Sequence, residues 1–208
     1  MSFEIWAAFV LAAGIVLIIP GPTIILVISQ SIAHGRKAVL PLSAGVVAGD
    51  FTAMTLSLLG LGAVLASSAA LFSILKWIGA AYLIYLGVKL WCADPDKEAI
   101  NPPQTATSNT SHFNRAFIVT ALNPKSIAFF VAFLPQFVRT QRDAFEQFVI
   151  LGATFLVLAG VNAMLYGFFA GRLRDAMLNS RVRRLFNRCG GSALVGAGLL
   201  TATLQRTS

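Results

Sequence analysis

The sequence IPGPT, residues 19–23, lies inside an apolar run that extends from residue 5 to about residue 29. Pro20 and Pro22 each lack an N–H and clash with the carbonyl one turn back, so neither continues a helix undisturbed. Gly21 between them removes the remaining local preference for helix. Irregular backbone at membrane depth persists only where it is buried in protein or lines a cavity. These residues are therefore the first candidate for a binding site.

The composition places the chain in a membrane. Of its 208 residues, 57% are hydrophobic and 12% are charged, whereas soluble domains carry about 25% charged residues. The net charge is +8, but the basic residues stand between apolar spans, so membrane topology explains them better than a nucleic-acid partner. Cys92 and Cys189 are isolated, which predicts neither a disulfide nor a metal site, and no cofactor is expected.

Six segments are long and apolar enough to cross a bilayer. The sequence predicts an all-α membrane protein whose spans are residues 5–32, 39–65, 71–91, 113–138, 148–170 and 189–204. Residue 5 follows an acidic rather than a basic start, so the first span is expected to be a retained helix and not a signal peptide.

Basic residues are unequally divided between alternate loops. The loops after the first, third and fifth spans carry Arg36, Lys37, Lys89, Lys97, Arg115, Arg172, Arg174, Arg181, Arg183, Arg184 and Arg188. The opposite side carries Arg139, Arg142 and Arg206, with Lys76 near its boundary. The positive-inside rule then predicts cytoplasmic basic loops, with both termini on the outer side of the membrane.

Three spans, a polar linker and three further spans predict two inverted three-helix repeats, because an odd number of crossings turns the second copy over. The repeats are residues 1–91 and 113–208, joined by a cytoplasmic linker at 92–112 within one integrated membrane domain. The first and fourth spans are both broken, the fourth at Asn123–Pro124. Paired interruptions at corresponding positions are a pointer to a transporter site, although two ordinary proline kinks are the simpler alternative.

Asp50 lies near the middle of the second span, where an ionised carboxylate costs about 2.5–3.5 kcal/mol on insertion scales. It must be neutral, paired or in contact with water. The functional interpretation is a site for a coupling proton or for a substrate amine. The structural alternative is a pair with Lys125, the other charge at mid-depth.

Three further residues complete the candidate site. Lys125 is expected to meet a substrate carboxylate, to snorkel or to neutralise Asp50. Asn123 is expected to cap the half-helix that follows it. Asn162 occupies the place in the fifth span that Asp50 occupies in the second, and a lone asparagine often bonds a neighbouring helix instead.

Other features have simpler explanations. Gly45 and Gly49 form a GxxxG pattern that favours close helix packing. A stripe of phenylalanines is expected to be lipid-facing or packing surface: Phe129, Phe130, Phe133 and Phe137. His34 and His112 are expected in solvated loops.

Taken together, the motifs resemble the lysine exporter (LysE) superfamily in its homoserine/threonine (RhtB-type) branch. The matching stretches cover nearly the whole chain and are residues 20–22, 34–35, 45–50, 76–83, 85–87, 122–126 and 133–137. The resemblance implies a bacterial inner-membrane exporter of amino acids or close derivatives, with homoserine, threonine and other neutral amino acids favoured, driven by the proton gradient.

Rival classes are an enzyme, a thiol–disulfide carrier, a small channel and an assembly factor. Intramembrane proteolysis would need HExxH, a Ser–His pair or a second aspartate, and a thiol carrier would need a cysteine beside each break. Only Asp50 lies inside a predicted span, with no second acid beside it, and neither break has a neighbouring cysteine, so the chain is not expected to be an enzyme or a thiol carrier. The expected partners are a small amino acid, protons and the lipid bilayer, with a homo-oligomer left open and no nucleic acid.

Overall fold

All elements in the described part of the chain are helical, as the sequence predicts. The computed structural model describes residues 1–67, 74, 77–78, 81–82, 84–85, 87–89, 91–93, 108–138, 144–172 and 180–203. The α-helices are α1 (Phe3–Ile18), α2 (Pro22–His34), α3 (Val39–Ser67), α5 (Asn109–Ala121), α6 (Pro124–Ala128), α7 (Ala144–Phe168) and α9 (Ser180–Thr203). Short helical turns are η1 (Arg36–Ala38), η2 (Phe129–Phe133) and η3 (Leu134–Phe137).

Both predicted breaks are present. α1 and α2 meet at a bend of 56°, and α5 meets the segment Pro124–Phe137 at a bend of 44°. A proline directly begins α2 and another begins α6; at this first helical position the missing N–H costs nothing and the fixed φ suits the helix. Each break thus has a proline, Pro22 or Pro124, at the first position of the half-helix that follows it.

Helix α3 packs most closely on α5, and two glycines permit it. A Cβ built on Gly49 would lie 2.7 Å from the Phe117 carbonyl oxygen and 2.7 Å from the Thr120 Cβ, and one on Gly45 would collide with the Phe113 carbonyl oxygen. Any side chain at these positions would force the helices apart. The prediction that the GxxxG pattern serves helix packing is confirmed.

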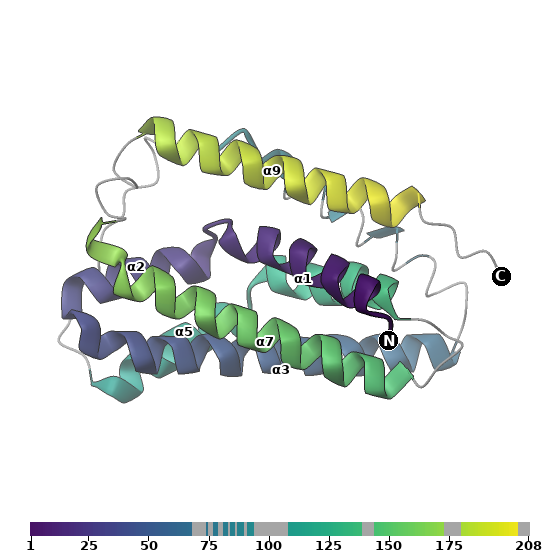
Figure 1. Cartoon of the computed structure of the whole chain (residues 1–208), viewed down its shortest axis with the longest axis horizontal. Helices are drawn as coiled ribbons and strands as arrows, with labels where there is room; N and C mark the ends of the chain where they lie inside the picture. Colours follow the sequence, from purple (N-terminus) through teal and green to yellow (C-terminus); the bar gives the residue numbers. More distant parts are fainter. Residues whose placement is uncertain are drawn as a thin grey trace.

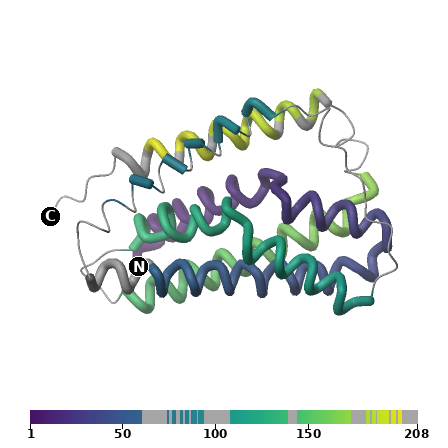
Figure 2. Tube along the Cα trace, turned by 180° about the vertical axis from the view of Figure 1, so that it is seen from behind, coloured from purple at the N-terminus to yellow at the C-terminus, as the bar shows by residue number. Residues whose placement is uncertain are grey.

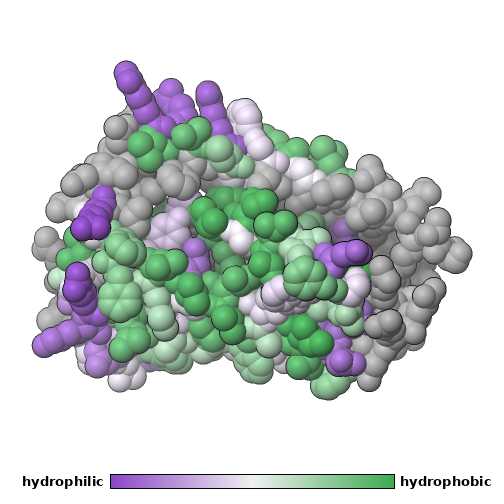
Figure 3. Space-filling model, in the orientation of Figure 1, coloured by the Kyte–Doolittle hydropathy of each residue, from purple (hydrophilic) through white to green (hydrophobic). Residues whose placement is uncertain are grey.

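The long helices lie roughly along one direction, with α3 and α7 beside each other and α1, α2, α5 and α6 packed against them (Figure 1). Seen from behind, the described residues between 74 and 91 run alongside α9 (Figure 2). Gly87 and Gly191 make this contact, because a Cβ on Gly87 would lie 2.6 Å from the Gly191 carbonyl oxygen. In the space-filling view, hydrophilic residues gather toward the ends of the long axis and apolar residues cover much of the middle (Figure 3).

Two helices in the described part are long and apolar enough to span a membrane, Arg36–Gly60 and Ala144–Phe168. The number rises to as many as four if each bent pair is one span. The helix α9 starts at Ser180, earlier than the predicted start of the sixth span at residue 189, and it is not among these candidate spans. Several positions of the third predicted span lie outside the described residues. The same holds for residues 94–107 of the linker and for the charges Lys76, Lys97, Arg139, Arg142, Arg174 and Arg206.

Candidate functional site

The two helix breaks meet α3 and α7 at a small internal cavity of about 30 Å³. This volume has room for about one or two water molecules. Its walls come from both halves of the chain: Leu17, Gly21, Thr23, Ile24, Val46, Asp50, Asn123, Lys125, Ser126, Ala159 and Asn162. The cavity is therefore the place where all the sequence-predicted interruptions converge.

Lys125 closes the open end of α1. Its Nζ donates hydrogen bonds to the carbonyl oxygens of Val16 and Ile19, each at 3.0 Å. The last carbonyls of a helix have no partner within the helix, and a cation there also complements the negative end of the helix dipole. The side chain thus does what the missing next turn of α1 would have done. The sequence-based alternatives for Lys125 did not include this role.

Two side chains of α7 bind the remaining carbonyls of the same helix end. Asn162 Nδ2 donates to the Leu17 oxygen at 3.0 Å, and the Tyr166 hydroxyl donates to the Ile18 oxygen at 2.6 Å. Four consecutive carbonyls, residues 16–19, are therefore satisfied by side chains of α6 and α7. Tyr166 was not predicted, because nothing in its local sequence separates it from an ordinary packing tyrosine.

Asn123 caps the second broken helix, as predicted. Its Oδ1 accepts a hydrogen bond from the backbone N–H of Lys125 at 3.0 Å. Its Nδ2 donates to the Thr23 hydroxyl at 3.2 Å, and the Thr120 hydroxyl lies 3.3 Å from the same oxygen. The start of α2 is thereby tied to the break between α5 and α6.

Asp50 lines the cavity from α3 and is 3% exposed. The Ser126 side chain acts on its carboxyl as a hydrogen-bond donor, and Lys125 is close enough to attract it electrostatically. Its Oδ1 is buried without a hydrogen-bond partner in the described structure. The Lys125 Nζ is bonded to the α1 carbonyls. Lys125 therefore attracts the Asp50 carboxyl without forming the direct pair that was the structural alternative for Asp50.

The eight predicted residues divide into two groups. Gly21, Asp50, Asn123, Lys125 and Asn162 line the cavity. Pro20, Pro22 and Pro124 do not line it; they set the backbone that opens it. The cavity also contains Thr23 and Ser126, which the sequence analysis missed because hydroxyl residues are common in membrane helices.

The cavity lies between two apolar clusters of unequal bulk. Toward the end of the molecule where α2 ends and α5 begins, the buried residues are aliphatic and smaller, and we call them the cluster of small residues: Val27, Ala38, Leu42, Val46, Ala116 and Ala163. Toward the other end the cluster is larger and aromatic, and includes Phe9, Phe129, Phe130, Phe133 and Phe155. The phenylalanine stripe is therefore packing surface, one of the two roles predicted for it.

The expectation of solvated histidines was wrong for His112. Its side chain is 3% exposed, and its ring packs edge-on against His34 with centroids 4.7 Å apart. The contact joins the end of α2 to the start of α5. Sequence reasoning treated the two histidines separately because 78 positions, from 34 to 112, separate them in the chain.

Fold and site together define a helical membrane protein in which two broken helices meet at a buried polar cavity. Such interrupted helices, with unwound ends facing a central site, are the construction of membrane transport proteins. The chain belongs to the LysE type translocator family, whose model matches residues 14–205.

Relatives of similar length agree with this membership. The chain is 34% identical to the "Homoserine/homoserine lactone efflux protein" of Salmonella typhimurium over 99% of both chains. It is 33% identical to an "Uncharacterized membrane protein" of Vibrio cholerae, over 99% of this chain and 100% of the relative. A "Leucine efflux protein" of Enterobacter sp. is 29% identical over 95% of this chain and 94% of its own. No solved structure matches the chain.

Proposed function

We propose that this protein exports amino acids or close derivatives across the bacterial inner membrane by proton antiport and alternating access. Homoserine, threonine and other neutral amino acids are the favoured substrates, in keeping with the names of its relatives. The observation that carries the proposal is the convergence of both helix breaks on one cavity that contains Asp50. The N-terminus of α2 would face the substrate carboxylate, and Asp50 would bind its amine or a proton.

Matching backbone at the two breaks supports an inverted repeat. Ile19 has φ −70° and ψ 116°, and Asn123 has φ −70° and ψ 112°. Both residues precede a proline, which disfavours the helical region for them. Furthermore, α3 packs on α5 as α7 packs on α1, which is the exchange of partners that two inverted halves would give. We therefore assign residues 1–91 and 113–208 to two three-helix repeats, with the linker 92–112 between them, and six spans in all.

The size of the cavity supports alternating access. About 30 Å³ is too small for an amino acid, so a substrate enters only when helices separate. On α2, Gln30 lies seven residues, or about 10 Å of helix, from the cavity residue Thr23. On α3, Ser43 lies the same number of residues from the cavity residue Asp50. Both Gln30 and Ser43 are buried with side-chain atoms that lack partners in the described structure. We propose that water reaches these groups when the cluster of small residues opens.

That opening would face the cytoplasm. The end of the molecule beyond the cluster of small residues carries Arg36, Lys37, Arg115 and Arg172. The positive-inside rule assigns such an end to the cytoplasm and both termini to the outside. The aromatic cluster would then form the outer gate. Because it buries larger side chains, it would be the harder gate to open.

Counterflow tests the function directly. In vesicles that contain the purified protein, unlabelled homoserine or leucine inside should accelerate uptake of the labelled compound several-fold. Empty vesicles and vesicles with the exposed-site variant Lys37→Gln provide the background and the matched control. A flux without such trans-stimulation would identify a channel, and no flux for any amino acid of a broad panel would favour an assembly factor.

We expect Pro20→Ala and Pro124→Ala each to reduce efflux by about tenfold or more. Without the proline, Ile19 and Asn123 regain access to the helical region, and a propagating helix would close the break. The carbonyls that Lys125 binds would then be used within α1. Initial efflux rates, normalised to the amount of protein in the membrane, measure the effect.

Pro41→Ala is the matched control for the proline variants. Pro41 lies in the first turn of α3, where no intrahelical N–H bond is lost. It should export at the parental rate. Parental efflux in both Pro20→Ala and Pro124→Ala would reduce the two breaks to ordinary proline kinks.

A further inference from the structure

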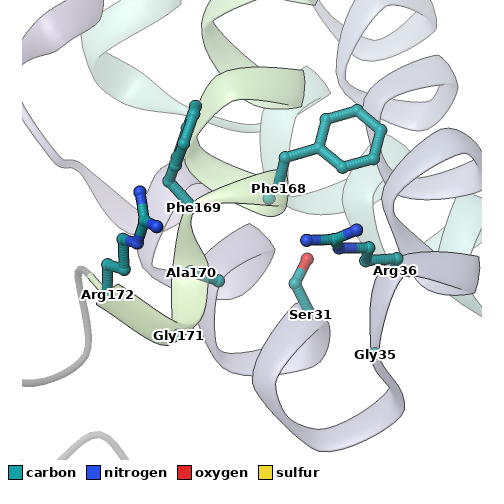
Figure 4. Close-up of a pocket in the computed structure, with 9 residues that line it drawn as sticks. Ser31, Gly35, Arg36, Phe168, Phe169, Ala170, Gly171 and Arg172 are labelled. Atoms are coloured by element: carbon teal, nitrogen blue, oxygen red, sulfur yellow. The ribbon is translucent and has the colours of Figure 1, made fainter.

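A second and much larger cavity, of about 580 Å³, lies at the basic end of the molecule. It is formed where the turn after α2 meets the end of α7 (Figure 4). Arg36 and Arg172 line it from these two elements. The Arg36 guanidinium is drawn beside Ser31, and the Arg172 guanidinium beside Phe169 (Figure 4). Neither arginine makes an ion pair or hydrogen bond within the described part of the chain. The described residues therefore leave both cations without a counter-charge.

A buried hydroxyl adds a third polar group. Ser31 lines the same cavity, is 6% exposed, and its Oγ has no hydrogen-bond partner in the described residues. Figure 4 places this oxygen beside the Arg36 guanidinium. Gly167 makes room for it, because a Cβ there would lie 3.3 Å from the Ser31 Oγ. A buried hydroxyl without a partner is rare, so this one calls for a polar partner, from water or from a ligand, inside the cavity.

Backbone geometry fixes the position of Arg36. Gly35 has φ +71°, in the left-handed region, and its N–H donates to the Ser31 carbonyl oxygen at 2.9 Å. Only glycine adopts this conformation without strain. The chain turns there, so that Arg36 begins η1 on the same side as Ser31.

The cavity is at the depth of lipid headgroups. Arg36 is the first residue of one candidate span and Phe168 the last residue of the other. Phe168 and Phe169 line the cavity and remain 46% and 47% exposed, as suits side chains in contact with acyl chains. A buried apolar cluster of Ile24, Ile28 and Ala170 lies between this cavity and the central one. The two cavities are therefore separate sites.

We propose that this cavity binds the phosphate of an anionic membrane lipid. Arginine pairs with phosphate through two parallel hydrogen bonds, and the Ser31 hydroxyl donates a further one. Basic pockets between helices on the cytoplasmic side are suited to such headgroups. The exposed phenylalanines receive the first part of the acyl chains. Lipid binding at this place would hold the α2–α3 turn against the end of α7.

Native mass spectrometry of the purified full-length protein, titrated with phosphatidylglycerol, tests the proposal without reference to transport. The parent should bind phosphatidylglycerol at least about tenfold more tightly than phosphatidylcholine. The double variant Arg36→Gln/Arg172→Gln should lose about tenfold or more in that affinity, since each charged hydrogen bond contributes about that factor. Lys37→Gln, which changes an exposed neighbour outside the cavity, should bind as the parent does.

Two further measurements decide the source of the phosphate and guard against misfolding. Inorganic phosphate at millimolar concentration should not displace the lipid; displacement would assign the site to free phosphate and overturn the lipid proposal. The variant Arg36→Lys/Arg172→Lys keeps the charge but loses the paired geometry, so it should show an intermediate affinity. Equal phosphatidylglycerol affinity in the parent and the lysine and glutamine double variants would also overturn it, whatever the result of the counterflow test.

Discussion

The variant Asp50→Asn is expected to lose pH-driven efflux completely while remaining folded in the membrane. Asparagine has nearly the same shape as aspartate, so it keeps the packing around the cavity and can still accept from Ser126. It has no proton to release or bind over the physiological range. If Asp50 carries the coupling proton, a pH gradient applied to vesicles will no longer drive export.

Stability should change little or rise in the same variant, and this separates coupling from folding. Asp50 is buried, and its Oδ1 lacks a partner in the described structure. A charge at such a site costs about 2.5–3.5 kcal/mol even on insertion scales, and asparagine removes that cost. Loss of efflux together with unchanged or higher stability would show that Asp50 serves proton coupling and not folding.

Exchange without a gradient completes the experiment. Counterflow of labelled against unlabelled amino acid needs no net proton movement, so Asp50→Asn should retain it if Asp50 serves only the proton. Loss of counterflow as well would assign Asp50 to the substrate amine. Thr55→Ala is the matched control and should keep pH-driven efflux, because Thr55 lies on the same helix outside the cavity and its hydroxyl donates to the Phe51 carbonyl oxygen of that helix. Unchanged coupling in Asp50→Asn would remove Asp50 from the mechanism.

Local chemistry made part of this site predictable from sequence. Proline is favoured at the first position of a helix, which predicts the helix starts at Pro22 and Pro124. Asparagine is a favoured N-cap residue, which predicts the role of Asn123. Both breaks and the cap occur where the sequence places them. The glycines of the GxxxG pattern were predictable for the same reason, because close approach requires a missing Cβ.

Long-range partners were not predictable. Lys125 meets carbonyls that lie 106 and 109 positions earlier in the chain, and Tyr166 meets one 148 positions earlier. No periodicity or motif links such positions. Charge alone suggested Asp50 as the partner of Lys125, since the sequence shows opposite charges but not four unpaired carbonyls at the end of a half-helix.

Lys125→Met is expected to be the most destabilising single substitution at the site. It preserves the length and apolar stem of the side chain but leaves the Val16 and Ile19 carbonyls without a donor. Hydrogen bonds to a charged group contribute about 1.5–3 kcal/mol each, so we expect a loss of roughly 3 kcal/mol or more. Asn162→Ala and Tyr166→Phe each remove one neutral bond between helices, for which about 0.6–1.7 kcal/mol is typical in membranes.

Thermal unfolding of the purified variants without substrate measures which of these substitutions lowers stability most. Lys37→Met, at an exposed position, is the matched control. Because substrate is absent, the measurement distinguishes a lysine that binds substrate from a lysine that completes α1. A lysine that only binds a substrate carboxylate would leave the empty protein as stable as the parent and weaken substrate affinity alone. A lysine that completes α1 destabilises the empty protein, and Lys125→Arg, which keeps the charge and the donors, recovers part of the loss. Lys125 also lines the central cavity. Efflux should therefore fall with stability across this series, because the break that admits a substrate exists only while its carbonyls are bound from the other half of the chain.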